Sequence, residues 1–456
     1  SGTMYYGKGL NVSLTSRDAV SGVKTTYYSV NGADFNTYNS NVPLNKEGKT
    51  IFKYYAADNV GNAEEINTKE FIIDLTAPKS SHSTSQPKLN DILSPKAKIT
   101  LSKSDNLSGV KYTKYQFDGG TEKTYYKPIT LWGLDDGNHT LTYYSTDQVS
   151  NKETAITYKF YLDRTPPELT SELIGDVYKK TYTYISSRTK VKLSAVDNKA
   201  GVKEIRYSID GKSYQTYTSE FKIPPVNGRH YVKFYAEDKV TNKNTPIVVD
   251  IPGAGSIYMD DRKPATSIRY GSPQFFHRDT LFINKETNIY LTSRDYHSGV
   301  QVTHYKIDAG AQKTYNNAFT IDPEGYHTIN FRAIDNVNNE ESFKTSHCFV
   351  DNTPPTIYTN FSIEPINSKK KDGKTYKVYP NYTKLYIGAT DKNCGTKRIR
   401  YSINGGAWED YSSPYTLDIS EVKHFSSAKF YEVKIEAYDQ LGNKQVKIIN
   451  FFISDN

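Results

Sequence analysis

Cysteine is scarce in this chain, with two residues in a length of 456. So few cysteines exclude a disulfide framework and any zinc cluster built on cysteine. No apolar run approaches the roughly 18 residues that cross a bilayer, which predicts no transmembrane segment in this part of the protein. The opening SGTMYYGKGL also lacks the charged and apolar regions of a signal peptide. We therefore expect an excerpt of a longer polypeptide whose export signal and anchor lie elsewhere.

A dense basic stripe is also missing. The net charge is +8, from 58 basic and 50 acidic residues scattered along the chain, which argues against a nucleic-acid partner. No nucleophile elbow or catalytic dyad confined to one region occurs, so we predict that the protein is not an enzyme and needs no catalytic cofactor. Hydrophobic residues reach only 36%, whereas 40 are tyrosine. Tyrosine buries its ring while its hydroxyl stays wet, which suits thin cores and half-solvated sheets.

One pentapeptide recurs at intervals of about 90 to 105 residues, the mark of duplicated domains. Each copy has Asp first, an aliphatic residue third and Asn last. The copies are DNVGN at 58–62, DQVSN at 147–151, DKVTN at 238–242, DNVNN at 335–339 and DQLGN at 439–443.

Three further motifs recur in a fixed order around the pentapeptide. The first is an Asp before a tight turn, as in DNLSGV at 105–110. The second is a tyrosine strand that ends in Asn-Gly or Asp-Gly, as in YSIDG at 207–211; such dipeptides predict a type I′ hairpin turn. The third is a closing Asp with proline, seen as DLTAP at 74–78, DRTPP at 163–167 and DNTPP at 351–355, with a degenerate DDRKP at 260–264.

Between these motifs the hydrophobic pattern has a period of two. In KFYAED at 233–238, Phe234 and Ala236 share one face. No stretch sustains helical periodicity. Short alternating strands at about ten-residue spacing predict an all-β chain of five β-sandwiches, joined by proline-stiffened linkers into an elongated rod on the order of 150–200 Å long. The predicted repeats one to five are 1–78 (lacking its first strand), 79–167, 168–264, 265–355 and 356–456.

At these motifs the sequence resembles bacterial immunoglobulin-like surface repeats, of the type found in spirochaetal outer-membrane proteins and other large exported adhesins. The motifs that carry this resemblance are Y-x-I-D-G-G, D-x-x-G-N and D-x-T-x-P, which cover essentially the whole chain. The resemblance implies tandem immunoglobulin-like (fibronectin type III-like) sandwiches. It also implies an exported protein, extracellular or displayed on the bacterial cell surface, which binds extracellular-matrix proteins or surface glycans.

In such a sandwich the loop after the second strand, the last hairpin turn and the incoming linker lie at one end. We therefore expect each closing Asp to meet the Asp and Asn residues of the next repeat. Clustered carboxylates and amides are ligands for Ca²⁺, so a structural calcium ion at each junction is one interpretation. The other is turn chemistry, because Asp and Asn side chains bond nearby backbone amides. The candidate residues are Asp74, Asp105, Asp147 and Asn151; Asp163, Asp197, Asp238 and Asn242; Asp260, Asp295, Asp335 and Asn339; Asp351, Asp391, Asp439 and Asn443.

The two cysteines flank the last of these predicted junctions. Cys348 precedes the linker Asp351, and Cys394 follows Asp391 in a turn that should face that linker. In an oxidising compartment this placement allows an inter-domain disulfide. The alternative is two free, partly buried thiols.

The predicted function is that of a non-enzymatic, adhesin-type binding and spacer array, with a monomer favoured. One alternative is a purely structural stalk whose active domain lies outside this stretch. Another is a carbohydrate-binding accessory region of a secreted hydrolase. Fold alone does not distinguish these alternatives, because sandwiches of this kind serve all three.

Overall fold

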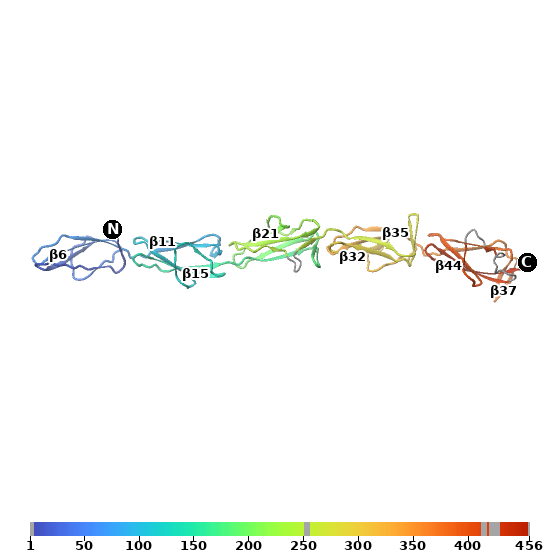
Figure 1. Cartoon of the computed structure of the whole chain (residues 1–456), viewed down its shortest axis with the longest axis horizontal. Coiled ribbons are helices and arrows are strands. Elements are labelled where there is room, and N and C mark those ends of the chain that lie inside the picture. Colours follow the sequence, from blue (N-terminus) through green and yellow to red (C-terminus); the bar gives the residue numbers. More distant parts are fainter. Residues whose placement is uncertain (1–3, 250–255, 412–416, 419–428, 455–456) are drawn as a thin grey trace. The chain divides into compact units, whose positions relative to one another are not determined.

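The computed structural model describes residues 4–249, 256–411, 417–418 and 429–454. All regular structure in this described part is β-strand (Figure 1). It contains no helix of the length and hydropathy that a membrane span requires. The chain forms two compact units, one of Ser1–Glu172, Val191–Phe221 and Tyr231–Gly255, the other of Leu173–Lys190, Lys222–His230 and Ser256–Asn456.

The strands of predicted repeats one and two form a larger and a smaller sheet each. In repeat one the larger sheet has the order β1 (Tyr5–Tyr6), β7 (Asn67–Ile73), β6 (Gly48–Asp58), β3 (Val23–Val30), β4 (Asn36–Thr37), and the smaller pairs β2 (Asn11–Val12) with β5 (Val42–Pro43). In repeat two the larger sheet has the order β13 (Lys123–Thr124), β12 (Val110–Phe117), β15 (Gly137–Asp147), β16 (Ile156–Leu162), β10 (Ile92–Leu93), β9 (Lys88–Leu89). The smaller sheet there is β14 (Ile129–Thr130), β11 (Lys98–Ser104), β8 (Lys79–Thr84). Repeat one has no counterpart of β8 among the described residues.

The strands of predicted repeat three are divided between the two compact units, and they form three sheets. One sheet is β17 (Glu168–Ile174), β20 (Lys190–Val196), β23 (Phe221–Lys222). A second is β22 (Gln215–Thr216), β21 (Val202–Ile209), β25 (Val232–Asp238), β26 (Ile247–Val248). The third is β18 (Val177–Lys179), β19 (Thr183–Ile185), β27 (Ile257–Met259), β24 (Gly228–His230).

Predicted repeats four and five return to two sheets. Repeat four pairs β28 (Ala265–Tyr270) with β31 (Ile289–Arg294), beside a sheet of β29 (Gln274–His277), β30 (Thr280–Ile283), β35 (Lys344–Val350), β34 (Gly325–Asp335), β32 (Val300–Ile307), β33 (Lys313–Thr314). Repeat five has β36 (Thr356–Phe361), β39 (Lys384–Thr390), β42 (Leu417–Asp418). Its other sheet is β37 (Asn367–Lys371), β38 (Lys374–Pro380), β44 (Lys444–Ser454), β43 (Phe430–Asp439), β40 (Thr396–Ile403), β41 (Glu409–Tyr411).

The predicted hairpin turns have the backbone that their sequences require. Asp210 and Gly211 have φ of 52° and 75°, which is the left-handed pair of a type I′ turn. Asn31–Gly32, Asp118–Gly119 and Asn404–Gly405 share it. Because this turn matches the right-handed twist of the flanking strands, it fixes the register of β21 against its hairpin partner at Arg206–Thr216.

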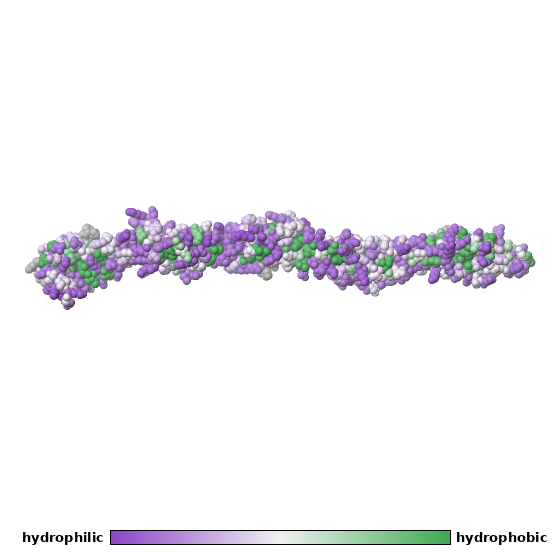
Figure 2. Space-filling view, turned by 180° about the vertical axis from the view of Figure 1, so that it is seen from behind, coloured by the Kyte–Doolittle hydropathy of each residue, from purple (hydrophilic) through white to green (hydrophobic). Residues whose placement is uncertain are grey.

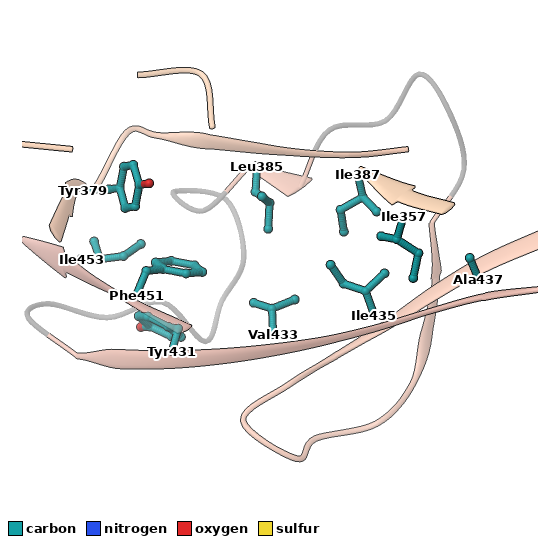
Figure 3. Packing of buried hydrophobic residues seen from close by; sticks show 10 residues of the cluster. All are labelled: Ile357, Tyr379, Leu385, Ile387, Tyr431, Val433, Ile435, Ala437, Phe451 and Ile453. Atoms are coloured by element: carbon teal, nitrogen blue, oxygen red, sulfur yellow. The ribbon is translucent and has the colours of Figure 1, made fainter. Parts of the chain in front are cut away.

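The period-two pattern places one face of each strand in a core. On β25 Phe234 and Ala236 are fully buried, as predicted, while Lys233 is exposed. In repeat five, Val433 and Ile435 from β43 meet Leu385 and Ile387 from β39 between the two sheets (Figure 3). Hydrophilic side chains cover most of the face seen in Figure 2, with hydrophobic groups in scattered patches. The described chain is thus a series of thin sandwiches with solvated outer faces.

Candidate functional site

The linker aspartates are fully buried charged groups that recur along the chain, as are the pentapeptide aspartates of repeats two to five. Asp74 follows β7 and is completely buried. Its backbone amide donates to Tyr6 O at 2.9 Å, and its Oδ1 accepts from Thr76 N at 3.2 Å, so the linker is held by its own repeat. Its Oδ2 accepts from Ser108 N of the next repeat at 2.9 Å, and its carbonyl accepts from Asn151 Nδ2 at 2.9 Å. One residue thus bonds the repeats on both sides.

The same pair of bonds to the following repeat occurs at the other three linker aspartates, all fully buried. The carboxylates accept from the turns after β20, β31 and β39, at Ala200 N (3.1 Å), Ser298 N (2.9 Å) and Cys394 N (3.1 Å) for Asp163, Asp260 and Asp351. The carbonyls accept from Asn242, Asn339 and Asn443 Nδ2 at 2.8, 2.7 and 2.7 Å, in the same order. We call each such arrangement a junction. Every junction lies within one compact unit.

The pentapeptide supplies the other half of each junction by folding on itself. Asp147 Oδ1 accepts from Val149 N and Asn151 N, and its Oδ2 accepts from Asn151 Nδ2. Asp58 makes the same three bonds with Val60 and Asn62, although no linker precedes it in the described chain. The turn therefore forms without a junction, as the turn interpretation predicts, and the Asn Nδ2 has a second proton to donate to a linker.

Three acidic groups gather at each of the first three junctions, with one oxygen from each within 4.8 Å of the others. The groups are Asp74, Asp105 and Asp147; Asp163, Asp197 and Asp238; Asp260, Asp295 and Asp335. At the last junction the group is Asp351, Asp439 and the Cys394 thiol. Asp391 is not in this group, although its Oδ1 accepts from Asn393 N and Gly395 N in the same way as its counterparts Asp105, Asp197 and Asp295 bond their own loops.

Burial and mutual repulsion oppose ionisation in these groups. Burial, together with the charges of Asp197 and Asp238, raises the pKa of Asp163 to about 6, although hydrogen bonds from Thr165 and Ala200 lower it. Burial also raises the pKa values of Asp238, Asp335 and Asp439, against the bonds that their turn amides donate. A proton or a cation at these groups would relieve the repulsion.

The residues of the first two junctions fit a hard cation in one respect. Most of their carboxylate oxygens already accept backbone or Asn donors. Asp105 Oδ1 and Asp197 Oδ2, however, are buried without a hydrogen-bond partner. A buried oxygen in that state is costly, and calcium takes such oxygens as ligands. At the last junction a protonated thiol takes the third place, which is a poorer donor set for calcium.

The structure does not form the predicted disulfide between Cys348 and Cys394: both thiols are free and buried. Cys348 points from β35 into the core of repeat four, whereas Cys394 packs with Phe282 and Leu441 in a separate small cluster. Burial raises the pKa of Cys348 to about 11. Burial, and then the Asp351 carboxylate that it faces, raise the pKa of Cys394 as well. Both thiols therefore stay protonated at neutral pH.

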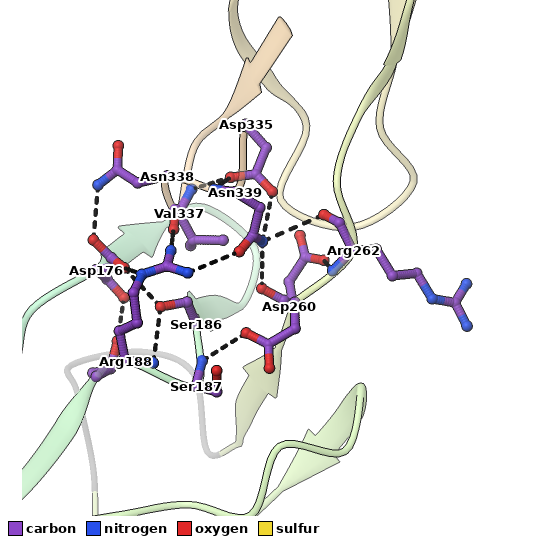
Figure 4. Close-up of polar contacts among 12 residues, drawn as sticks. Asp176, Ser186, Ser187, Arg188, Asp260, Arg262, Asp335, Val337, Asn338 and Asn339 are labelled. Atoms are coloured by element: carbon purple, nitrogen blue, oxygen red, sulfur yellow. Dashed lines mark hydrogen bonds and ion pairs between the residues drawn. The ribbon is translucent and has the colours of Figure 1, made fainter. Parts of the chain in front are cut away.

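The junction between predicted repeats three and four has an additional clamp that the sequence motifs did not indicate (Figure 4). Arg188 donates to Val337 O at 2.7 Å and to Asn339 Oδ1 at 3.3 Å, while its Nε pairs with Asp176 Oδ2 at 2.6 Å. Asp176 Oδ1 accepts from Asn338 Nδ2 at 2.8 Å. The guanidinium thus ties the loop after β19 to the pentapeptide turn of the next repeat. No repeated signal marks Arg188, so only the tertiary structure reveals it.

An acidic residue before the glycine that opens the long central strand is a second feature missed by the motif analysis. Glu47 accepts from Thr76 Oγ1 at 2.6 Å and from Asn106 Nδ2 at 2.7 Å, and so contacts both the linker and the next repeat. Asp136 accepts from Thr165, and Glu324 from Thr353 and Asn393. The recurring acid-Gly pair in EG, DG and EG at 47–48, 136–137 and 324–325 is the signal that could have identified it.

The folded chain defines a class: it is an all-β tandem array of immunoglobulin-like sandwiches. No protein-family model matches it, and no curated protein does. Among solved structures it is similar to a tetra-tandem repeat in the extending region of a large adhesion protein, at 13% identity and a TM-score of 0.32, covering 83% of this chain and all of that one.

Fibronectin(III)-like modules of Clostridium thermocellum CbhA align at 13% identity and a TM-score of 0.24, covering 39% of this chain and 94% of theirs. A 1.5-MDa bacterial ice-binding adhesin aligns at 11% and 0.29, covering 52% of this chain and 86% of that one. Similarities this low carry no argument about function.

Proposed function

We propose that this chain is part of a non-enzymatic, exported bacterial protein that works as an adhesin-type binding and spacer array, secreted or displayed on the cell surface. The observation that carries the proposal is the junction: four buried linker aspartates each bond the following repeat through both carboxylate and carbonyl. A chain that only needed to tether independent domains would gain nothing from four such joints. Joints of this kind restrict bending and hold a binding surface at a distance.

Small-angle scattering of the full chain tests the spacer role. We expect a maximum dimension on the order of 150–200 Å, the length of the sandwiches placed end to end. Replacing the four junction asparagines (N151A, N242A, N339A and N443A) should shorten the mean dimension and broaden its distribution. Asn62→Ala is the matched control, because Asn62 makes the same turn bonds without a described linker to hold. Equal scattering from all three proteins would contradict the proposal.

The adhesive role needs a separate assay. An array of extracellular-matrix proteins and surface glycans should show saturable binding of the full chain to at least one ligand. Deletion of one particular repeat should abolish that binding while scattering still reports an ordered remainder. Binding to nothing on the array, with scattering as expected, would leave a purely structural stalk.

We also propose that Ca²⁺ binds at the first two junctions, favoured by the buried, unpartnered Asp105 Oδ1 and Asp197 Oδ2. Asp74 and Asp147 would complete the first site, and Asp163 and Asp238 the second. Bound calcium would neutralise the carboxylates and stiffen the linker. A ligand at 100 times its Kd stabilises the folded state by about 2.7 kcal/mol. Melting in calcium should therefore occur well above melting in chelator, and identical midpoints would refute the site.

A further inference from the structure

Predicted repeat two carries a solvent-exposed tryptophan beside a cavity that none of the recurring motifs accounts for. Trp132 is 86% exposed. The cavity has a volume of about 440 Å³, within the range of small-ligand sites. It lies where the edge strands β13 and β14 of the two sheets approach each other, and Tyr115, Lys123, Lys127 and Leu134 line it with Trp132.

The local backbone forces this indole outward. Leu131 is fully buried and Leu134 packs against the same core, so the two leucines anchor the segment on both sides of Trp132. Leu134 N donates to Leu131 O at 3.3 Å, and Gly133 between them has φ of 97°. A turn with a left-handed third residue is type II, which requires glycine there and presents its second residue to solvent.

Repeats one, three and four, where the equivalent segment is described, lack this turn. Five residues, 132–136, separate the buried Leu131 from the next strand-opening glycine, whereas three, 322–324, follow the equivalent Ile321. The extra length holds the Trp132–Gly133 turn. Because repeats one, three and four fold without it, the turn is not needed for the sandwich, and it presents to solvent a large aromatic ring of the kind that anchors ligands.

The rim of the cavity is positively charged. Within the described part of the chain, neither Lys123 nor Lys127 has a carboxylate at ion-pair distance. Two acids close by in the sequence are occupied elsewhere: Glu122 pairs with Lys114 at 3.3 Å, and Asp136 accepts from Arg164 N at 2.7 Å. Two ammonium groups without a carboxylate partner therefore lie beside an aromatic ring, an arrangement that favours an anionic ligand.

We propose that this cavity binds an acidic sugar, with Trp132 stacking on the apolar face of the ring and Lys123 and Lys127 pairing with its carboxylate. A sugar ring presents axial C–H groups to an aromatic face and polar groups at its edge, which matches an exposed indole flanked by donors. Flexible lysines recognise the charge as a point, so uronate and sulfate groups both suit them. The site lies on one repeat and does not depend on the junctions.

Tryptophan fluorescence of the full chain tests the site, because Trp132 and Trp408 are the only tryptophans. In a Trp408→Phe background, a galacturonic-acid tetrasaccharide should change the emission saturably, and a neutral galactose tetrasaccharide should bind at least tenfold more weakly. Calorimetry should show at least tenfold weaker binding of the acidic sugar to Trp132→Ala. The Lys123→Ser/Lys127→Ser variant should lose the preference for acidic over neutral sugar.

Two variants control for stability and net charge. Tyr296→Ala removes an equally exposed aromatic from repeat four, and Lys103→Ser/Lys111→Ser removes the same charge from repeat two away from the cavity. Both should bind the acidic tetrasaccharide as the parent does. The proposal would be overturned if Trp132→Ala bound the acidic tetrasaccharide as the parent does, or if the charge control lost as much affinity as Lys123→Ser/Lys127→Ser. It would also be overturned if the parent bound the neutral sugar equally well, or bound anionic phospholipid vesicles but no acidic sugar. These outcomes are independent of the scattering test of the spacer role.

Discussion

Asp197→Asn should stabilise the protein at neutral pH in chelator, against the usual cost of removing a hydrogen-bonded carboxylate. Asp197 Oδ1 accepts from Lys199 N and Gly201 N, and its Oδ2 is buried without a partner near Asp163 and Asp238. An asparagine keeps Oδ1 for the two amides. It places Nδ2, a donor, where the unpartnered oxygen faces two carboxylates.

The expected gain follows from charge and distance. At an effective dielectric constant of about 20, two like charges 4.8 Å apart repel by about 3.5 kcal/mol. Partial protonation of Asp163, whose pKa is raised to about 6 by burial and by its acidic neighbours, removes part of that repulsion in the native protein. Neutralising Asp197 also weakens its two amide bonds by about 1 kcal/mol each. The net gain should be about 1–2 kcal/mol.

The pH dependence has a definite sign. With a raised folded-state pKa, Asp163 binds its proton more tightly in the folded than in the unfolded chain. Its contribution therefore favours folding at low pH and is lost as pH rises from 3.8 to about 6. In D197N the pKa of Asp163 should fall, so the difference in stability between variant and parent should grow across this range and level off above it.

Calorimetry of the full chain between pH 4.5 and 8 in chelator measures this difference, and hydrogen exchange of the 197–242 segment assigns it to the junction. Asp18→Asn is the matched control: Asp18 bonds Val20 N, Ser21 N and Gly22 N in the same kind of turn but belongs to no triple carboxylate group in the described chain. D18N should be neutral or slightly destabilising. A D197N variant that is less stable than its parent at pH 7 would refute the electrostatic reasoning.

Three further predictions concern other parts of the chain. Arg188→Ala removes the bonds to Val337 and Asn339 and should lower the stability of that junction by about 1–3 kcal/mol, seen as faster hydrogen exchange at 335–339. Burial opposes ionisation of Glu436, but bonds from a tyrosine, an arginine and a lysine lower its pKa to about 2. The stability that the ionised Glu436 contributes is present above its unfolded-state pKa of 4.5 and is lost as pH falls toward 2. Glu436→Gln should therefore weaken the dependence of the stability of repeat five on pH in this range. Cys348 and Cys394 should resist alkylation until the protein is denatured, and peptide masses should be the same with and without reductant.

The local structure follows closely from the residues. Alternation in KFYAED predicts that Phe234 and Ala236 are buried, and they are. Asn-Gly and Asp-Gly predict left-handed turns because few other residues tolerate them, and Asp210–Gly211 adopts one. Strand alternation and turn conformation are determined by interactions between residues close in sequence, so a few residues are enough to predict them.

Which side chains meet at each junction could be seen only in the tertiary structure. Proximity of the closing Asp to the next pentapeptide follows from topology, whereas the place of the Cys394 thiol instead of Asp391 in the last group does not. The placement of Cys348 and Cys394 in different clusters depends on which face of β35 meets the core. Side-chain direction over such distances is set by packing between strands, which motif spacing does not encode.

The recurring residues by themselves determined an all-β chain of repeated sandwiches and the turns that shape them, because strand period and turn chemistry are local properties. Tertiary structure alone decided that Arg188 clamps one junction, that two carboxylate oxygens are buried without partners, and that Trp132 stands beside two unpaired lysines. The Arg188 clamp and the carboxylate groups join residues far apart in the chain, and all three features depend on distances that arise only when the sheets pack.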